Sequence, residues 1–218
     1  EYILKFEGAY HGHHDSVQVS SWNEDKAELG PAHRPHSAAA SAGIPQAIVD
    51  LTIVAPFNDL AAVEAIFADM GGDIAGIIVE PVLMNCGIVP PEPGFLEGLR
   101  RVANSHGALL TYDEVKTGLT IGPGGATQRF GVTPDIVCLA KALGGGLPVA
   151  AVGGSAQVMD AIRSGRYDQV GTFNGNPLGM AAAKAMLTEV MVPATFARMI
   201  EVESRIRTAA ERIIAEYE

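Results

Sequence analysis

An amine and a carboxylate each follow a strand-like segment of this sequence. Lys141 comes directly after residues 135–140, and Asp113 comes at the end of the apolar run 108–112. A lysine amine can form an imine with a carbonyl compound, and a carboxylate favours the protonated form of a nearby aromatic ring nitrogen. Pyridoxal phosphate requires both groups, because its aldehyde is held by a lysine and its pyridine ring accepts electrons best when protonated. The two residues therefore indicate a pyridoxal-phosphate site.

The same residues also have more ordinary interpretations. A lysine after a strand is often a solvated surface charge, and Asp113-Glu114 could begin a helix. The glycines 144–146 could simply let the backbone turn tightly after Lys141. They could also contribute to a phosphate-binding loop, as could glycine-rich residues 122–125. Neither stretch has the Gly-Lys-Ser/Thr ending of a nucleotide P-loop or the spacing of a dinucleotide fingerprint.

A cluster of histidines offers a different chemistry. His11, His13 and His14 lie beside Asp15, and imidazole and carboxylate groups can ligate zinc or iron. The only further histidines at a plausible distance along the chain, 33 and 36, lie in a long polar segment. A metal centre is therefore an alternative interpretation of residues 11–15.

Composition narrows the class of protein. The 218 residues are 48% hydrophobic and 18% charged, which predicts a globular protein with a well-formed core. The formal net charge is −10 and the basic residues are scattered, so nucleic-acid binding is disfavoured. No apolar stretch approaches the ~18 residues of a membrane span, and no basic-then-apolar leader begins the chain. We therefore expect no nucleic-acid partner and no membrane association.

The two cysteines bear on the cellular compartment. Cys86 and Cys138 are far apart in sequence, and both lie in apolar contexts. This pattern predicts buried free thiols in a reducing compartment, without a disulfide framework. A cytoplasmic location is the default expectation.

Strand-like and helix-like segments alternate along the chain. This order predicts an α/β fold, a mostly parallel sheet with helices on both faces. Strands are expected at 2–6, 74–79, 108–113, 135–140 and 149–153. Helices are expected at 58–70 with Asn58 as N-cap, at 93–106 ended by Gly107, at 176–190 begun by Asn176-Pro177, and at 193–218.

The loops and chain ends predict the domain organisation. Residues 21–46 and 118–128 show no clear period and are expected to be irregular. The chain begins inside a strand and stops within a charged helix, which suggests a fragment of a longer protein. We expect residues 1–190 to form a cofactor-binding large domain lacking its N-terminal part. Residues 191–218 would then lead into a small C-terminal domain.

Five segments together resemble a known family. They are KFEGAYHGH at 5–13, IIVEP at 77–81, YDEV at 112–115, LAKALGGGLP at 139–148 and GTFNGNP at 171–177. In this order the segments resemble the class III aminotransferases, and within that class they are most similar to the glutamate-1-semialdehyde 2,1-aminomutases. The resemblance implies the fold-type I large domain of pyridoxal-phosphate enzymes, with active sites shared across a homodimer.

The resemblance also assigns roles around the cofactor ring. Lys141 would form the Schiff base and carry the proton between carbon centres. Asp113 would pair with the pyridine nitrogen, and Val115 would pack on one face of the ring. Tyr10 would stack on the opposite face, with His11 beside it.

Three further residues complete the implied site. Glu80 and Asn85 would join the polar network around the ring and its phenolic oxygen. Thr172 would reach the cofactor phosphate of the neighbouring subunit, so that each site would need two chains.

The sequence departs from the aminomutase pattern in several places. The phosphate-binding Ser-Gly-Thr segment that the family places before the first strand is absent. Lys116 and Thr120 stand where the aminomutases have methionine and arginine. The sequence Gly-Thr-Phe-Asn at residues 171–174 also differs from the more common Thr-Leu-Ser of the family. An alternative is therefore a class III transaminase that moves an amino group from an amino acid, beta-amino acid or amine to a keto acid. A non-catalytic remnant of the fold is a second alternative.

Overall fold

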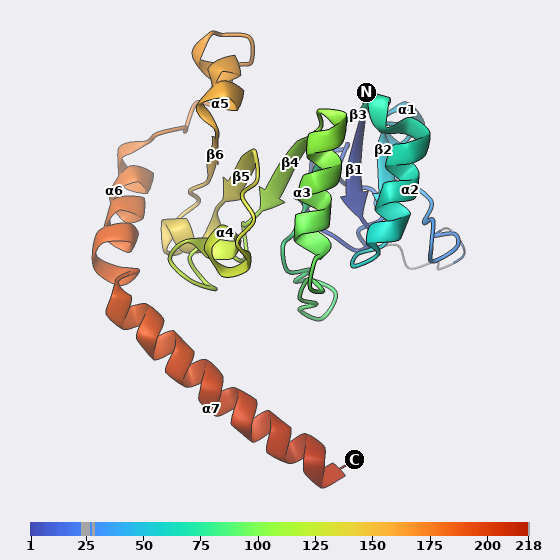
Figure 1. The fold of residues 1–218 in the computed structure, drawn as a ribbon. Helices are drawn as coiled ribbons and strands as arrows, with labels where there is room; N and C mark the ends of the chain where they lie inside the picture. The colour runs from blue at the N-terminus through green and yellow to red at the C-terminus, as the bar shows by residue number, and fades with distance from the viewer. Residues whose placement is uncertain (23–26, 28, 218) are drawn as a thin grey trace.

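The structure is a computed structural model that describes residues 1–22, 27 and 29–217. The described residues form a six-stranded sheet of order β2-β1-β3-β4-β5-β6 (Figure 1). Its strands are β1 (Tyr2–Phe6), β2 (Thr52–Ala55), β3 (Ile74–Val79), β4 (Leu109–Asp113), β5 (Ile136–Leu139) and β6 (Ala151–Gly154). Only the β5–β6 pairing is antiparallel. The predicted mostly parallel α/β sheet is thereby confirmed.

The strand order reverses direction beside β1. The chain first passes to β2 on one side of β1, and then returns to β3 on the other side. From there β4 and β5 follow in sequence order. In open parallel sheets a ligand crevice forms outside the carboxyl ends of the strands at such a reversal. The topology therefore marks the carboxyl ends of β1 and β3 as the place to look for a site.

Two helices cover one face of the sheet. They are α2 (Leu60–Met70) and α3 (Phe95–His106), which lie side by side in front of the sheet in Figure 1. Leu4 and Phe6 of β1 point toward them and are fully buried. The Phe6 ring packs edge-on against Phe95, with centroids 5.5 Å apart. Apolar burial of this kind supplies most of the free energy that holds helices on a sheet.

The opposite face is covered by the segment between β1 and β2. Side chains alternate along a strand, so Lys5 points away from the helical face that Leu4 and Phe6 occupy. On this second face Val19, Val49 and Val54 form a small buried cluster. The segment contributes one short helix, α1 (Gln46–Val49), and an isolated bridge between residues 19 and 39.

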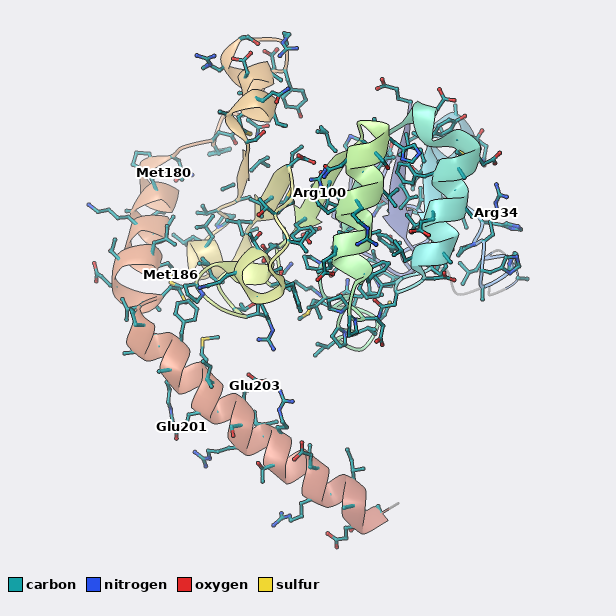
Figure 2. All side chains as sticks on the ribbon, in the orientation of Figure 1. Arg34, Arg100, Met180, Met186, Glu201 and Glu203 are labelled. Atoms are coloured by element: carbon teal, nitrogen blue, oxygen red, sulfur yellow. The ribbon has the colours of Figure 1, made fainter. Side chains whose placement is uncertain are left out.

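An ion pair fixes β5 beside β4. Arg100 of α3, labelled in Figure 2, donates to Asp135 Oδ2 over 2.7 Å. The same oxygen accepts a hydrogen bond of 2.7 Å from the backbone N–H of Leu110. Asp135 therefore ties the start of β5 both to α3 and to β4. This connection sets where β5 ends, and so where Lys141 lies.

The remaining helices follow β4. They are α4 (Gly125–Phe130), the 3₁₀ turn η2 (Lys141–Gly144), α5 (Ala156–Arg163), α6 (Pro177–Ala185), the π-helical turn η3 (Met186–Val190) and α7 (Pro193–Tyr217). Asn176 caps α6 by accepting a 2.8 Å hydrogen bond from Gly179 N, as predicted. Helix α7 extends away from the sheet (Figure 1), and Phe196 is its only buried residue.

Several predicted boundaries are wrong. The N-cap of α2 is Asp59, which accepts from Ala62 N, and not Asn58. Asn58 has a φ of 65°, and its side chain donates to Pro90 O and accepts from Glu92 N. It therefore connects the loop before α2 to the segment that precedes α3. Helix α3 begins at Phe95 and not at residue 93, because Gly94 before it has a left-handed backbone conformation. Strand β6 spans residues 151–154 and not 149–153.

Some elements were not predicted at all. Strand β2 and helices α1 and α5 have no counterpart in the expectations, because each is too short to show a clear period. The irregular stretch expected at 118–128 contains the start of α4. Of the irregular stretch expected at 21–46, residues 23–26 and 28 lie outside the described part of the chain.

The prediction of buried cysteines is wrong for Cys86. The bridge between Leu83 and Val89 closes a short loop that projects residues 85–88 toward solvent, so Cys86 is exposed. Its thiol donates to Gly8 O over 3.4 Å. Cys138 is half-buried, and burial raises the pKa of its thiol. Both thiols are free. None of the described helices has the length and apolar character needed to cross a membrane.

The packing of α3 on the sheet leads to a stability prediction. Leu99 is fully buried in the main core, so Leu99→Ala should lower the free energy of unfolding by about 2–5 kcal/mol, through lost transfer energy and a residual cavity. Ile200→Ala, at a position 65% exposed on α7, should change it by less than about 0.5 kcal/mol. Urea unfolding followed by circular dichroism measures both values. Equal effects of the two variants would contradict this description of the core.

Candidate active site

Functional side chains gather at the carboxyl edge of four neighbouring strands. Tyr10 and His11 follow β1, Glu80 follows β3, Asp113 ends β4 and Lys141 follows β5. Adjacent strands in a sheet lie about 4.8 Å apart, so residues at their ends are brought within side-chain reach. In the register of the sheet, Asp113 is the partner of Cys138, close to where β5 ends.

Asp113 is the centre of this arrangement. Its Oδ2 lies 2.8 Å from Nδ1 of His11, and its Oδ1 accepts a 3.0 Å hydrogen bond from Val115 N. The side chains of His11 and Asp113 are only 1% and 9% exposed. The second ring nitrogen of His11, Nε2, is buried and has no hydrogen-bond partner among the described residues. Two donors therefore fix the carboxylate in one orientation.

Tyr10 is held by its backbone and by its ring. Its N–H donates to Glu80 Oε1 over 2.9 Å, and Met84 N donates to the other oxygen of Glu80 over 3.3 Å. The Tyr10 ring stacks on Trp22, with centroids 4.5 Å apart and planes 27° from parallel. Glu80 is buried. Because its two oxygens accept from Tyr10 and Met84, its carboxylate connects the loop after β1 to the loop after β3.

Lys141 lies at the edge in an unusual backbone conformation. Its φ is 44°, in the left-handed region that costs a non-glycine residue roughly 1–3 kcal/mol, and it begins the η2 turn. The residue is exposed, and its amine makes no hydrogen bond or ion pair with any described residue. Such strain is commonly found where the fold directs a reactive side chain.

Close packing with α6 and η3 holds the turn that carries Lys141. Gly145 has a φ of 56°, and a Cβ there would lie 2.6 Å from Sδ of Met186. Met186, labelled in Figure 2, therefore occupies the space that a side chain at position 145 would need. The glycines after Lys141 thus serve a tight turn and a close helix approach.

Three further predicted site residues have the following surroundings. Asn85 is exposed, and its Oδ1 accepts a hydrogen bond from the amine of Lys116, so it does not join the polar contacts of Glu80. Val115 contributes its backbone N–H to Asp113. Thr172 is exposed in the segment before α6 and forms no hydrogen bond or ion pair with any described residue.

Glu114 has a role different from that of its neighbour Asp113. Its Oε2 accepts from Ala126 N over 2.7 Å and from Thr117 Oγ1 over 3.1 Å, and the residue is buried. A Cβ on Gly125 would lie only 2.3 Å from this oxygen. Glu114 therefore orders the loop before α4, and Gly125 leaves room for its carboxylate.

Sequence reasoning gave no role to two residues that contact Tyr10 or the loop that carries it. Trp22 forms the stack with Tyr10, although it lies in a polar stretch without periodicity. Lys5 is completely buried on β1 and bonds to the loop that carries Tyr10. The one available signal for Trp22 was that it is the only tryptophan in the sequence.

The histidine-rich segment does not assemble a metal centre in the described part of the chain. His11 bonds to Asp113, His13 to the Gln18 amide, and His14 accepts from Ser16 N. No group of three or more metal-ligating side chains was found among the described residues.

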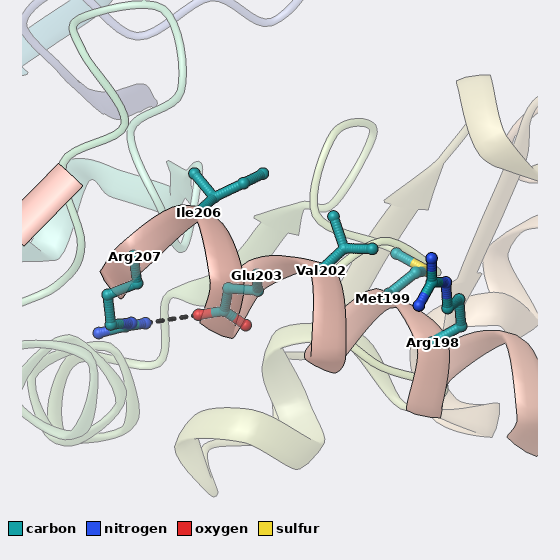
Figure 3. A pocket seen from close by; sticks show the side chains of 6 residues that line it. All are labelled: Arg198, Met199, Val202, Glu203, Ile206 and Arg207. Carbon is teal, nitrogen blue, oxygen red and sulfur yellow. Dashed lines mark hydrogen bonds and ion pairs between the residues drawn. The ribbon is translucent and has the colours of Figure 1, made fainter. Parts of the chain in front are cut away.

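Two hollows of the surface lie away from these residues. One, of about 630 Å³, is lined by α7 alone and is shown in Figure 3, where Glu203 pairs with Arg207. Another, of about 650 Å³, lies between α7 and the loops around Met84 and Thr120. Neither is lined by Lys141 or Asp113. The first is a groove along a single helix and encloses no small molecule, and the second contains none of the predicted site residues, so we place the candidate site at the sheet edge.

The residues at the sheet edge fit a flat, cationic aromatic ring with a reactive carbonyl. Asp113 offers a carboxylate of fixed orientation, and the Tyr10 ring offers an aromatic surface. Lys141, just after the neighbouring strand, offers an amine with no partner among the described residues. Nε2 of His11, which has no hydrogen-bond partner among the described residues, adds a buried polar atom beside Asp113. Pyridoxal phosphate has the groups that this donor set matches.

Comparison with known proteins places the chain in a family. The class III aminotransferase family model matches residues 1–218, so the chain belongs to that family. Curated relatives include a glutamate-1-semialdehyde 2,1-aminomutase 2 of Exiguobacterium sibiricum, 49% identical over 86% of this chain and 42% of the relative. A glutamate-1-semialdehyde 2,1-aminomutase of Roseiflexus castenholzii is 45% identical over 98% of this chain and 48% of the relative.

Solved structures give the same result for the fold. An omega-transaminase from Sphaerobacter thermophilus matches with a TM-score of 0.91 and 35% identity, over 99% of this chain and 49% of that one. A glutamate-1-semialdehyde aminomutase from Pseudomonas aeruginosa, in complex with PMP, matches with a TM-score of 0.81 and 30% identity, over 99% and 48%. The predicted family is confirmed, and the chain spans about half the length of these relatives.

The contacts of Asp113 predict a cost for its removal. Asp113→Ala would leave the His11 ring buried with neither nitrogen bonded, and would also free Val115 N. Leaving buried polar groups unpaired costs about 1–3 kcal/mol, so the free energy of unfolding should fall by that amount. The control is Asp15→Ala at an exposed aspartate near the same loop. Urea unfolding that showed no difference between the variants would refute the paired arrangement.

Proposed function

We propose that this chain binds pyridoxal 5′-phosphate through a Schiff base on Lys141 and serves PLP-dependent amino-group transfer. The observation that carries the proposal is the convergence of Lys141 and Asp113 at the carboxyl ends of adjacent parallel strands. Membership of the class III aminotransferase family supports it. The solved structure of a transaminase with PLP bound, 28% identical with a TM-score of 0.87, also supports it.

Each residue would then have a defined task. When bound, the cofactor supplies a ring that accepts electrons from the substrate carbon. Asp113, held by His11 and Val115 N, would keep the ring nitrogen protonated, because an opposite charge favours the cationic form. The Lys141 amine would anchor the aldehyde carbon and later move a proton between substrate carbons. Tyr10 would cover one face of the ring and exclude water from it.

Glutamate-1-semialdehyde 2,1-aminomutase-like activity is the first candidate reaction. Curated relatives that are 42–49% identical to this chain bear this name. In this reaction the amino group would return to a neighbouring carbon of the same molecule, so no second substrate would be needed.

A transaminase reaction is the second candidate. The solved omega-transaminase superposes with the higher TM-score, 0.91 against 0.81 for the aminomutase. In addition, Lys116 and Thr120 stand where the resemblance to the aminomutases would place methionine and arginine, and the Lys116 amine here donates to Asn85. Transfer to a keto acid would then complete the cycle.

The proposal extends to assembly and domains. A homodimer in the cytoplasm is proposed, in which Thr172 would reach the cofactor phosphate of the partner subunit. Several exposed apolar side chains near Thr172 are consistent with such an interface, among them Tyr167, Val170, Phe173 and Leu178. Residues 1–190 would form the cofactor domain. Helix α7 would begin the connection at 191–218 to a small C-terminal domain.

The lysine assignment gives the sharpest test of the reaction. Lys141→Ala should lower turnover of glutamate-1-semialdehyde or an amine donor by at least about 10³-fold, because the covalent anchor and proton carrier are both lost. The matched control is Lys184→Ala, at an exposed lysine on α6. Steady-state assays with excess pyridoxal phosphate measure both. Wild-type turnover in Lys141→Ala would overturn the proposal.

A second assay separates the two candidate reactions. Incubation of the loaded protein with a ¹⁵N-labelled amino donor and unlabelled 2-oxoglutarate should yield no labelled glutamate if the protein is an aminomutase. Mass spectrometry of the recovered acids detects the transfer. Stoichiometric labelling of glutamate would contradict the mutase reaction and establish the transaminase.

A further inference from the structure

A buried lysine lies beneath the loop that carries Tyr10. Lys5 is on β1, is completely buried, and points to the face of the sheet opposite α2 and α3. Its amine donates to Ala9 O over 2.8 Å, to Ser21 Oγ over 3.2 Å and to Val19 O. An ammonium group has three donors, so every one of them is used. A fully buried charge with complete hydrogen bonding is uncommon and requires an explanation.

The acceptors of Lys5 immediately precede the stacked aromatic pair. Ala9 is followed by Tyr10, and Ser21 is followed by Trp22. Ser21 Oγ also donates to Ala9 O over 3.0 Å, so the two backbone segments are joined twice at this point. The Tyr10 and Trp22 rings then meet 4.5 Å apart. Lys5 thus fixes the bases of both aromatic residues without touching either ring.

Electrostatics support a charged amine in this position. Burial lowers the pKa of Lys5 to about 8, while the nearby carboxylates of Glu7 and Glu80 act in the opposite direction. The amine therefore keeps its proton at neutral pH, and hydrogen bonds from a charged donor are stronger than neutral ones. Glu80 also accepts from Tyr10 N, so the same carboxylate stabilises Lys5 and orients the loop.

We infer that Lys5 is a positioning residue that aligns the Tyr10–Trp22 pair as the aromatic wall of the cofactor site. That the ring packed against this aromatic wall is the pyridine ring of pyridoxal phosphate rests on the proposed function. The alignment itself does not, because it depends only on contacts within the chain. Lys5 acts through Ala9, Val19 and Ser21 and does not touch the reacting atoms.

A purely space-filling role makes a different prediction. Replacing a buried ionic group with an apolar side chain of similar size is often neutral or stabilising. If Lys5 only filled the core, Lys5→Met would leave the loop unchanged. If Lys5 holds the loop, the same substitution would leave Ala9 O and Val19 O without their donor and loosen both segments, even where global stability is preserved.

The test compares variants of the full chain by hydrogen exchange with mass spectrometry. Lys5→Met should speed amide exchange in residues 9–13 and 19–22 by about tenfold, the factor that corresponds to ~1.4 kcal/mol of lost local stability. Exchange in β4 should not change. Acrylamide quenching of Trp22, the only tryptophan of the sequence, should increase in parallel.

Two controls separate positioning from general destabilisation. Val63→Ala removes buried volume from α2 on the opposite face of the sheet, and should not change exchange in the two loop segments relative to β4. Ser21→Ala removes one acceptor of Lys5 and the link to Ala9, and should give a smaller increase in the same two segments. Ser21→Ala also keeps the test informative if Lys5→Met does not fold.

The outcomes are distinct from those that test the cofactor. Unchanged exchange and quenching in both Lys5→Met and Ser21→Ala would overturn the positioning role, whatever Lys141 does. Loosened loops together with no cofactor adduct on Lys141 would retain the role of Lys5 and reject the proposed function. In cofactor-loaded protein, Lys5→Met should also reduce the visible circular dichroism of the bound ring, because its asymmetric aromatic surroundings are lost.

Discussion

The parallel pairing of β1, β3, β4 and β5 is the constraint on which the rest of the structure depends. Parallel strands all end at the same edge, so residues that are far apart in sequence emerge there together. The register places Asp113 opposite Cys138, and Asp135 ties the start of β5 to Arg100 and Leu110. A shift of one residue along β5 would turn its side chains to the other face of the sheet and move Lys141 away from Asp113. The hydrophobic packing of α2 and α3 supports this pairing.

Buried polar groups then decide which side chains are available at that edge. Asp113 and Glu114 are adjacent carboxylates, but they point in different directions. Glu114 is occupied by Ala126 N and Thr117, whereas Asp113 is oriented by His11 and Val115 N and faces the site. Glu80 and Lys5 both bond to the backbone of the loop after β1, which carries Tyr10, and hold that loop in place. By contrast, the Lys141 amine has no described partner and lies on a strained backbone, which is the arrangement of a group held ready for a ligand.

The sequence was most informative where a feature repeats or is long. Strand β3 and the glycine that ends α3 were predicted because a continuous apolar run and a helix stop signal are local properties. The positions of Lys141 and Asp113 followed from strand ends, and the family resemblance supplied Tyr10, His11 and Glu80. Tertiary contacts could not be inferred in this way. Asn58 lost its capping role to Asp59 because its side chain bonds residues far along the chain. The engagement of Asn85 by Lys116, the stacking of Trp22 and the burial of Lys5 likewise depend on which loops meet.

The central claim is that Lys141 is the residue that binds pyridoxal phosphate covalently. The most direct measurement is to add the cofactor to the purified chain, reduce with borohydride and locate the modified lysine by peptide mass mapping. We expect a pyridoxyl group on Lys141, with Lys5, Lys116 and Lys184 unmodified, because Lys5 is buried, the Lys116 amine is bonded to Asn85 and Lys184 lies on α6. Modification spread evenly over the exposed lysines, or its absence from Lys141, would contradict the assignment of Lys141 as the residue that binds the cofactor.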